Sequence, residues 1–218
     1  MSIAIVLVDN HGITREGLRL LIERQEDMEV VGEAADGREA VRLANNLEPN
    51  LVIMDVSLPG LNGVDAARQI IKANPEVKVL ALSAYANKRF VIDMLTVGAL
   101  GYVLKDGMAG ELVRAIHAVM NGERYLSTKV AGIVIDNYIN NGEDGNGKPS
   151  LNMLTPKERE LLQLLVEGNL SKSAARLLSL SIKTVDARRR DIMNKLRMSS
   201  LADLTKFAIR EGLTTVDF

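Results

Sequence analysis

The sequence predicts an α/β domain with a doubly wound, five-stranded parallel sheet, followed by a smaller all-α domain of four helices. Three observations predict this arrangement. Short apolar runs alternate with segments of helical periodicity over 1–122, a polar stretch rich in Gly and Asn follows at 140–150, and the periodicity after it is helical throughout. Alternating strands and helices are typical of a parallel sheet covered on both faces. We therefore expect domains at 1–122 and 151–218, with a linker helix and a flexible linker over 123–150.

Five short runs rich in aliphatic residues form the predicted strands. Segments with apolar residues at helical spacing separate them. The first and third runs are almost wholly apolar, as expected for strands that are buried on both faces. The five predicted strands are Ile3–Val8, Glu29–Gly32, Leu51–Met54, Val77–Leu82 and Tyr102–Leu104.

The segment that joins the two domains begins as helix and ends as a polar linker. A helix over about 108–120 is expected to end at Asn121-Gly122, because glycine readily adopts the left-handed conformation of a helix C-cap. A further helix is expected over about 127–139. The stretch at 140–150 has no apolar face to bury and predicts a flexible linker.

The C-terminal segment has the signals of a helix-turn-helix. Thr155-Pro156-Lys157-Glu158 predicts a capping box with proline at the first helical position. A short helix at about 171–178 is joined by Ser179-Leu180-Ser181 to a longer helix at about 182–197, and a final helix follows. Two helices joined by a tight turn inside a four-helix unit are typical of this motif.

Composition and charge exclude several classes of protein. The 218 residues include no Cys and two His, which excludes disulfides, thiolate zinc sites, a thiol nucleophile and a His-rich metal site. No export signal is visible and no apolar run approaches the roughly 20 residues needed to cross a bilayer, so we expect a cytoplasmic protein without a membrane partner. The segment from Lys148 onward carries a net charge of +5 and the rest −6, which suggests a nucleic acid as partner of the basic half.

Polar side chains follow four of the predicted strands. Asp9 and Asn10 come after the first strand, Asp55 after the third, Ser83 after the fourth and Lys105 after the fifth. Sites in open parallel sheets form at the carboxyl ends of the strands. Paired oxygen ligands suit Mg²⁺, a lysine can anchor phosphoryl oxygens, and a carboxylate can accept a phosphoryl group as an acyl phosphate. The constellation predicts phosphoryl transfer onto Asp55.

These residues and their neighbours resemble the receiver domain of two-component response regulators, a flavodoxin-like fold. The resemblance covers the first 122 residues and rests on Asp9-Asn10-His11, Asp55 with Leu58-Pro59-Gly60, Ser83-Ala84 and Gly101-Tyr102-Val103-Leu104-Lys105. It implies a regulator, not an enzyme, that a sensor histidine kinase phosphorylates on Asp55. The implied roles are Asp55 as phosphoacceptor, Ser83 and Lys105 as catalytic contacts to the phosphoryl group, Ser83 and Tyr102 as the switch, and Asp9, Asn10 and Asp55 as Mg²⁺ ligands.

Asn10 departs from this family, which usually has a second acid at that position. An Asn carbonyl can coordinate Mg²⁺, but the loss of one negative charge predicts weaker binding. One alternative is therefore a pseudo-receiver transcription factor that is regulated without phosphorylation. Another is a phosphatase with an aspartyl-phosphate intermediate, which needs a second acid, commonly two residues past the nucleophile; Ser57 stands there.

The longer helix of the C-terminal domain combines a buried stripe with a basic surface. With Ser181 as its cap, Val185, Ile192 and Leu196 form the stripe that faces the core. Arg188, Arg189 and Arg190 are spread around the rest of the helix, which has a diameter that fits the DNA major groove. The outward positions are Lys183, Asp186, Ala187, Arg190 and Asn194.

The domain from Leu154 onward resembles the LuxR-type helix-turn-helix of the NarL/FixJ response regulators. The resemblance implies a transcription regulator that binds double-stranded DNA and dimerises when active, with two recognition helices about 34–36 Å apart. The last helix, with Leu204 and Phe207, is the expected dimer contact of this domain. The implied base contacts are Asp186, Ala187 and Arg190, and the implied phosphate contacts are Lys183, Thr184, Arg188 and Arg189.

Overall fold

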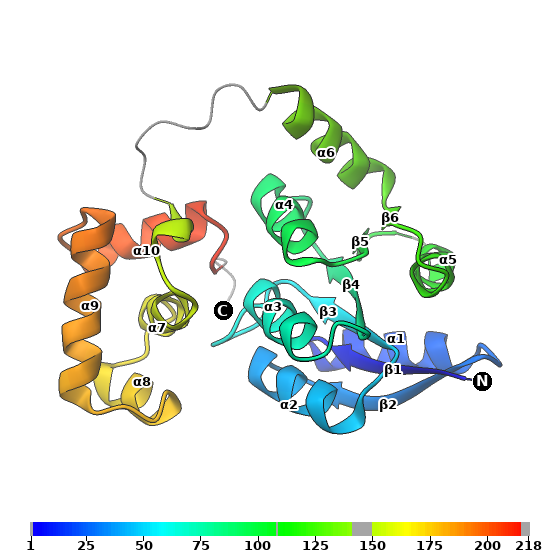
Figure 1. Cartoon of the computed structure of the whole chain (residues 1–218), viewed down its shortest axis with the longest axis horizontal. Coiled ribbons are helices and arrows are strands. Elements are labelled where there is room, and N and C mark those ends of the chain that lie inside the picture. Colours follow the sequence, from blue (N-terminus) through cyan, green and yellow to red (C-terminus); the bar gives the residue numbers. More distant parts are fainter. Residues whose placement is uncertain (1, 108, 141–149, 215–218) are drawn as a thin grey trace. The chain divides into compact units, whose positions relative to one another are not determined.

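The computed structural model describes residues 2–107, 109–140 and 150–214 (Figure 1). The chain divides into two compact units, Met1–Asn141 and Gly142–Phe218. The core of the predicted flexible linker, 141–149, lies outside the described residues. Among the described residues, no helix is long and apolar enough to span a membrane.

The N-terminal unit is built on a parallel sheet with the strand order β2-β1-β3-β4-β5-β6. The prediction of a doubly wound parallel sheet is confirmed, although the sheet has six strands and five were predicted. The additional strand has only two residues, too few to give a periodic signal in the sequence. The strands are β1 (Ile3–Val8), β2 (Met28–Ala34), β3 (Leu51–Asp55), β4 (Lys78–Ser83), β5 (Gly101–Leu104) and β6 (Tyr125–Leu126).

Helices cover both faces of this sheet (Figure 1). Alternate residues of β1 point to opposite faces: Ile5 and Leu7 pack in one apolar cluster, and Val6 and Val8 in the other. The first cluster is closed by α1 (Gly12–Glu23) and α5 (Ala109–Met120). The second is closed by α2 (Gly37–Leu47), α3 (Gly63–Ala73), α4 (Lys88–Val97) and α6 (Thr128–Asn140).

The helix α6, predicted as a linker helix, packs against α4 within the N-terminal unit. Its Val130 is fully buried in the same cluster as Tyr102 of β5. The strand β6 leads into α6 and is held to β5 by backbone hydrogen bonds, from Tyr125 N to the Leu100 carbonyl and from Ser127 N to the Tyr102 carbonyl, both 3.1 Å. The chain after residue 122 therefore adds a further strand and helix to the α/β unit.

The C-terminal unit is all helical, as predicted. Thr155 and Glu158 form the predicted capping box at the start of its first helix. Glu158 also accepts a hydrogen bond of 2.7 Å from Lys195, which ties this helix start to the end of α9. The elements are a 3-10 turn η1 (Leu151–Met153), α7 (Pro156–Val166), α8 (Ser171–Leu177), α9 (Ile182–Leu196) and α10 (Leu201–Arg210).

The core of this unit contains the predicted stripe of α9, since Val185, Ile192 and Leu196 are fully buried. It also contains Leu204 and Phe207 of α10, which are 0% and 1% exposed. The predicted dimer contact is therefore wrong for Leu204 and Phe207, because they fill the core of their own unit and present no surface to a partner. For the exposed residues of α10, such as Leu201, it stays a prediction.

Ser179 lies in the turn between α8 and α9 and has a φ of +54°, a backbone conformation that glycine adopts without strain. We expect Ser179→Gly to stabilise the C-terminal unit by roughly 1 kcal/mol, because the strain of a left-handed non-glycine residue is removed. Thermal unfolding measures this change. The matched control is Ser173→Gly inside α8, which is expected to destabilise by about 0.5–1 kcal/mol. Equal effects of the two substitutions would contradict the assignment of strain to Ser179.

Candidate functional site

Two buried carboxylates meet at the carboxyl edge of the sheet. Asp55 is the last residue of β3, and Asp9 follows β1 directly. The two strands are neighbours, with Val8 paired to Met54, so their ends bring the carboxylates together. Asp9 is 0% and Asp55 2% exposed. Paired buried carboxylates repel each other and need a cation nearby.

Lys105 supplies that cation from the end of β5. Its Nζ lies 2.7 Å from Oδ2 of Asp9 and 2.6 Å from Oδ2 of Asp55. Burial alone would lower the pKa of Lys105, but the charge of Asp55 and the hydrogen bonds to both carboxylates raise it overall. Lys105 is therefore a protonated lysine held between two acids.

Burial raises the pKa of Asp55 above its ordinary value, while Lys105 acts in the opposite direction. A raised pKa means that the folded protein favours the protonated form of this acid relative to the unfolded chain. The contribution of Asp55 to stability is therefore greatest at low pH and is lost as the pH rises through the raised pKa. At neutral pH the buried carboxylate costs stability, as is common for residues kept for their chemistry.

Ser83 and Tyr102 lie on the neighbouring strands β4 and β5 and are both fully buried. The Tyr102 hydroxyl donates a 3.1 Å hydrogen bond to the carbonyl of Tyr85, and Tyr85 N donates one of 3.2 Å to Oγ of Ser83. Burial raises the pKa of Tyr102 to about 12. The loop after β4 thus connects Ser83, beside the acids, with the ring of Tyr102 in the core.

The turn after β1 contains the expected third oxygen ligand, Asn10, which is exposed to solvent. Beside it, His11 N donates a 2.8 Å hydrogen bond to Oδ1 of Asp9. Carboxylate and amide oxygens are ligands that Mg²⁺ accepts, so Asp9, Asn10 and Asp55 fit this ion by ligand type.

Sequence analysis missed Arg15, which holds the same turn from α1. Its guanidinium donates to the carbonyl of Asp9 at 2.7 Å and to Oε2 of Glu33 at 2.9 Å. Nothing in the sequence pattern singled it out, because both contacts depend on how the turn between β1 and α1 folds beside β2.

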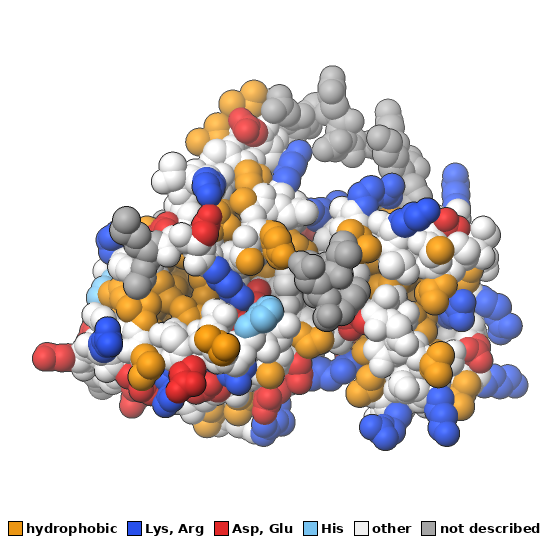
Figure 2. Space-filling view, turned by 180° about the vertical axis from the view of Figure 1, so that it is seen from behind, with side chains coloured by type: hydrophobic (Ala, Val, Ile, Leu, Met, Phe, Trp, Pro, Cys, Tyr) orange, Lys and Arg blue, Asp and Glu red, His pale blue; other side chains and the backbone are white. Residues whose placement is uncertain are grey.

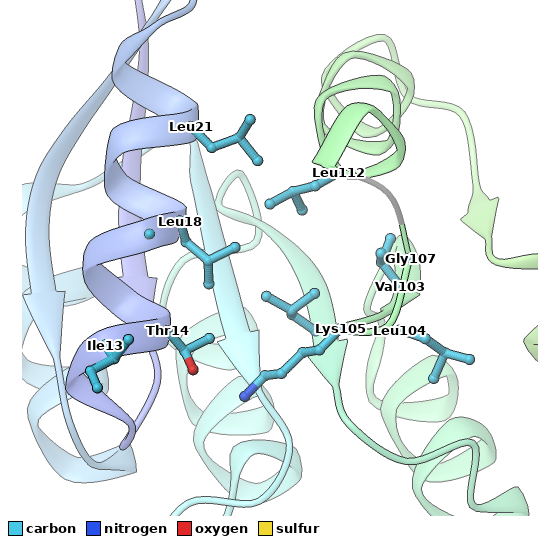
Figure 3. A pocket seen from close by; sticks show the side chains of 11 residues that line it. Ile13, Thr14, Leu18, Leu21, Val103, Leu104, Lys105, Gly107 and Leu112 are labelled. Carbon is cyan, nitrogen blue, oxygen red and sulfur yellow. The ribbon is translucent and has the colours of Figure 1, made fainter.

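A mainly apolar pocket of about 290 Å³ borders the acidic site. Leu18 and Leu21 of α1, Leu112 of α5 and Val103 of β5 line it, and Lys105 forms part of its rim. Figure 3 shows Lys105 reaching from the end of β5 toward the first turn of α1. The pocket adjoins the lysine, while the two carboxylates lie outside its lining.

The exposed face of α9 carries Lys183, Asp186 and Arg190, as predicted. Among the described residues, no acid pairs with Lys183 or Arg190. Asp186 differs, because its Oδ1 accepts a 2.8 Å hydrogen bond from Ser171 of α8. The predicted contacts Thr184, Ala187, Arg188 and Arg189 are only partly exposed, and Oγ of Thr184 is engaged with Ser181.

A second basic element, which sequence analysis missed, lies on α8. Lys172 and Arg176 line a pocket of about 330 Å³ together with Asn169. Figure 2 shows Lys and Arg side chains projecting from the visible face of the C-terminal unit. Both helices of the helix-turn-helix therefore present cations.

Family comparison agrees with both halves of this description. Residues 5–117 match the model of the response regulator receiver domain, and residues 152–208 match that of the bacterial regulatory proteins of the luxR family. The chain belongs to the LuxR-type response regulators. Its two units are accordingly a receiver domain and a LuxR-type DNA-binding domain.

Two relatives match this chain over nearly their whole length. The oxygen regulatory protein NreC of Staphylococcus carnosus is 34% identical over 96% of this chain and 98% of its own. The transcriptional regulatory protein LiaR of Bacillus subtilis is 36% identical over 97% of this chain and 99% of its own.

Two solved structures are similar to this response regulator. A two-component response regulator of the LuxR family from Aurantimonas is 38% identical, with a TM-score of 0.61 over 64% of this chain and 99% of that chain. The response regulator RcsB in complex with DNA is 26% identical, with a TM-score of 0.60 over 95% and 98%.

Proposed function

We propose that this response regulator binds double-stranded DNA in the cytoplasm under the control of phosphorylation at Asp55 by a sensor histidine kinase. The observation that carries the proposal is the grouping of Asp9, Asp55 and Lys105, in which the lysine contacts both buried carboxylates. Two buried carboxylates cost stability. Together with Lys105 they provide an acceptor carboxylate and a cation for the oxygens of an acyl phosphate.

The proposed step transfers one phosphoryl group. An oxygen of the Asp55 carboxylate forms a bond to phosphorus as the bond from phosphorus to the donor breaks, and the donor leaves with the electron pair. Lys105 then moves its contact from the carboxylate to a phosphoryl oxygen, and the Ser83 hydroxyl donates to another. Mg²⁺ bound by Asp9, Asn10 and Asp55 would supply charge neutralisation for the phosphoryl oxygens.

The route from this site to the linker helix runs through β5 and Ser127. Ser127 is buried, and its Oγ accepts a 3.2 Å hydrogen bond from Leu104 N and donates one of 2.7 Å to Glu111. Leu104 precedes Lys105, and Ser127 N donates to the carbonyl of Tyr102. Thr128, the next residue, begins α6. A shift of Lys105 or Tyr102 on phosphorylation would therefore move Ser127 and, with it, the start of α6.

Ser127→Ala is expected to uncouple the two domains. Phosphoryl incorporation should stay within about twofold of wild type, because the hydrogen bonds of Ser127 go to Leu104, Tyr102 and Glu111 and not to Asp9 or Asp55. The gain in DNA affinity on phosphorylation should fall by about tenfold, a typical coupling energy. Binding titrations with and without a phosphodonor measure this. Lys129→Ala, which removes an exposed pair with Asp106, is the matched control and should keep the gain. An unchanged gain in Ser127→Ala would contradict this route.

The DNA-binding half of the proposal rests on the exposed cations of α9 and α8. Lys183 lies in the first turn of α9 and Arg190 near the middle of this helix, and both are exposed. The N-terminal part of the second helix is where helix-turn-helix proteins contact base edges. Lys172 and Arg176 extend the basic surface along α8. The similar structure of RcsB was solved with DNA.

We also propose that the active form is a homodimer. With Leu204 and Phe207 buried, other apolar side chains must supply the contact. Ile13 on α1 and Tyr138 on α6 are 93% and 84% exposed and are the candidates in the receiver. Sedimentation of the phosphorylated protein tests this proposal, because a purely monomeric active form would contradict it.

The experiment that tests the proposed function is a DNA titration with and without a small-molecule phosphodonor and Mg²⁺. Affinity for the preferred DNA is expected to rise on phosphorylation in the wild type and to stay constant in Asp55→Asn. A rise in both proteins would place the control elsewhere than Asp55.

A further inference from the structure

An imidazole lies beside the two buried carboxylates. Nδ1 of His11 is 3.3 Å from Oδ1 of Asp9. One possible ligand atom from each of Asp9, His11 and Asp55 lies within 4.8 Å of the other two. Within the described part of the chain, this is the one cluster of at least three His, Cys, Asp or Glu side chains that could hold a metal ion.

We propose that His11 is a direct ligand of the divalent cation at this site, so that the site selects a first-row transition ion such as Co²⁺ over Mg²⁺ more strongly than oxygen ligands alone would. This inference rests on the proposed function, since it concerns the same site, and it deepens that function by naming the class of ion. His11 stands beside Asn10, the position that lacks a carboxylate.

Charge supports a role for the imidazole. The side chains of Asp9, Asp55 and Lys105 carry a net charge of about −1, and Asn10 adds none. Mg²⁺ is a hard cation that binds through carboxylates and water, so a site short of one carboxylate loses Mg²⁺ affinity in particular. Imidazole nitrogen suits transition ions and contributes to binding without a negative charge.

The geometry is compatible with a shared ion. Two ligand atoms that bind one transition ion at about 2.0–2.2 Å are roughly 3 Å apart when they are neighbours in its coordination shell. The separation of 3.3 Å between Nδ1 of His11 and Oδ1 of Asp9 is close to this value. Lys105 contacts the Oδ2 atoms of Asp9 and Asp55. Oδ1 of Asp9 accepts one hydrogen bond, from His11 N at 2.8 Å, and a carboxylate oxygen has a second lone pair for the ion.

The test measures metal binding directly, without any phosphodonor. Co²⁺ is titrated into tag-free full-length protein and followed by its visible absorption, and Mg²⁺ is titrated in parallel by calorimetry. His11→Ala removes the imidazole at a side chain that is 69% exposed, so the fold should persist. The chain has only two histidines, so His117→Asn, on α5 and paired with Asp27, is a matched control.

The expected result is a loss of Co²⁺ affinity of at least about tenfold in His11→Ala, with the absorption band of a nitrogen ligand lost and Mg²⁺ affinity changed by less than about threefold. His117→Asn should change neither affinity. Asn10→Asp should strengthen Mg²⁺ binding and so narrow the preference for Co²⁺.

Unchanged Co²⁺ binding in His11→Ala, or equal losses for Co²⁺ and Mg²⁺, would overturn the proposal. The outcome is independent of phosphorylation: a chain that binds Co²⁺ through His11 and never accepts a phosphoryl group would contradict the proposed function and leave this inference standing. Conversely, if Asp55 is phosphorylated but His11→Ala leaves the Co²⁺ and Mg²⁺ affinities unchanged, only this inference is contradicted.

Discussion

Lys105→Met is expected to lower the free energy of unfolding of the receiver unit by about 3 kcal/mol when divalent cations are removed. The ammonium group lies within 2.7 Å of two carboxylates that are almost completely buried. Without it, Asp9 and Asp55 repel each other in a medium that screens charge poorly. Urea denaturation followed by circular dichroism, in the presence of a chelator, measures the loss.

Two controls separate this cause from simple loss of packing. Adding Asp55→Asn to Lys105→Met should recover much of the stability, because one of the two repelling charges is gone. Asp55→Asn alone should be more stable than wild type at pH 7, and this difference should shrink as the pH falls toward the ordinary pKa of 3.8. A double variant no more stable than Lys105→Met would contradict the account of the acidic pair.

The second large effect is expected on α9, where Arg190→Ala and Lys183→Ala should weaken DNA binding in different ways. Arg190 is a proposed base contact, so its loss should cost about 1–3 kcal/mol on the preferred sequence and much less on unrelated DNA. Lys183 is a proposed phosphate contact, so its loss should weaken binding to all sequences alike. It should also reduce the slope of log affinity against log salt by about 0.9.

Fluorescence anisotropy with specific and unrelated duplexes, over a series of salt concentrations, distinguishes these effects. Lys206→Ala, on α10 and away from the helix-turn-helix, is the control and should change neither the affinity nor the salt slope. Equal losses for Arg190→Ala on both duplexes would remove it from the base contacts. An unchanged salt slope in Lys183→Ala would show that this lysine does not neutralise a phosphate.

Much of the fold could be predicted from local patterns. The alternation of apolar runs with helical periodicity located β1, β3 and β4 to within a residue or so. The starts of α7 and α9 were also predicted correctly, from the capping box of Thr155 and Glu158 and from the N-cap Ser181. Such caps are hydrogen bonds between residues close together in the chain, so the sequence alone reveals them. The two-residue strand β6 was missed, because its pairing with β5 comes from backbone hydrogen bonds and leaves no periodicity.

The contacts that complete the site could not be predicted in this way. The strand ends bring Asp9, Asp55 and Lys105 to one edge of the sheet. The hydrogen bond from Arg15 to the Asp9 carbonyl depends on the folded turn between β1 and α1, and the hydrogen bond from Leu104 N to Ser127 joins residues 23 apart in the chain. The part of the dimer prediction that named Leu204 and Phe207 was wrong for a related reason. An apolar face at helical spacing, such as Leu204 and Phe207, predicts burial but does not say which surface covers it.

The most direct test of the central claim is the intact mass of the protein after incubation with a small-molecule phosphodonor and Mg²⁺. The account predicts the gain of one phosphoryl group in the wild type and none in Asp55→Asn. The absence of any gain at high Mg²⁺, in the wild type and in Asn10→Asp alike, would contradict it and would indicate a receiver that controls DNA binding without phosphorylation.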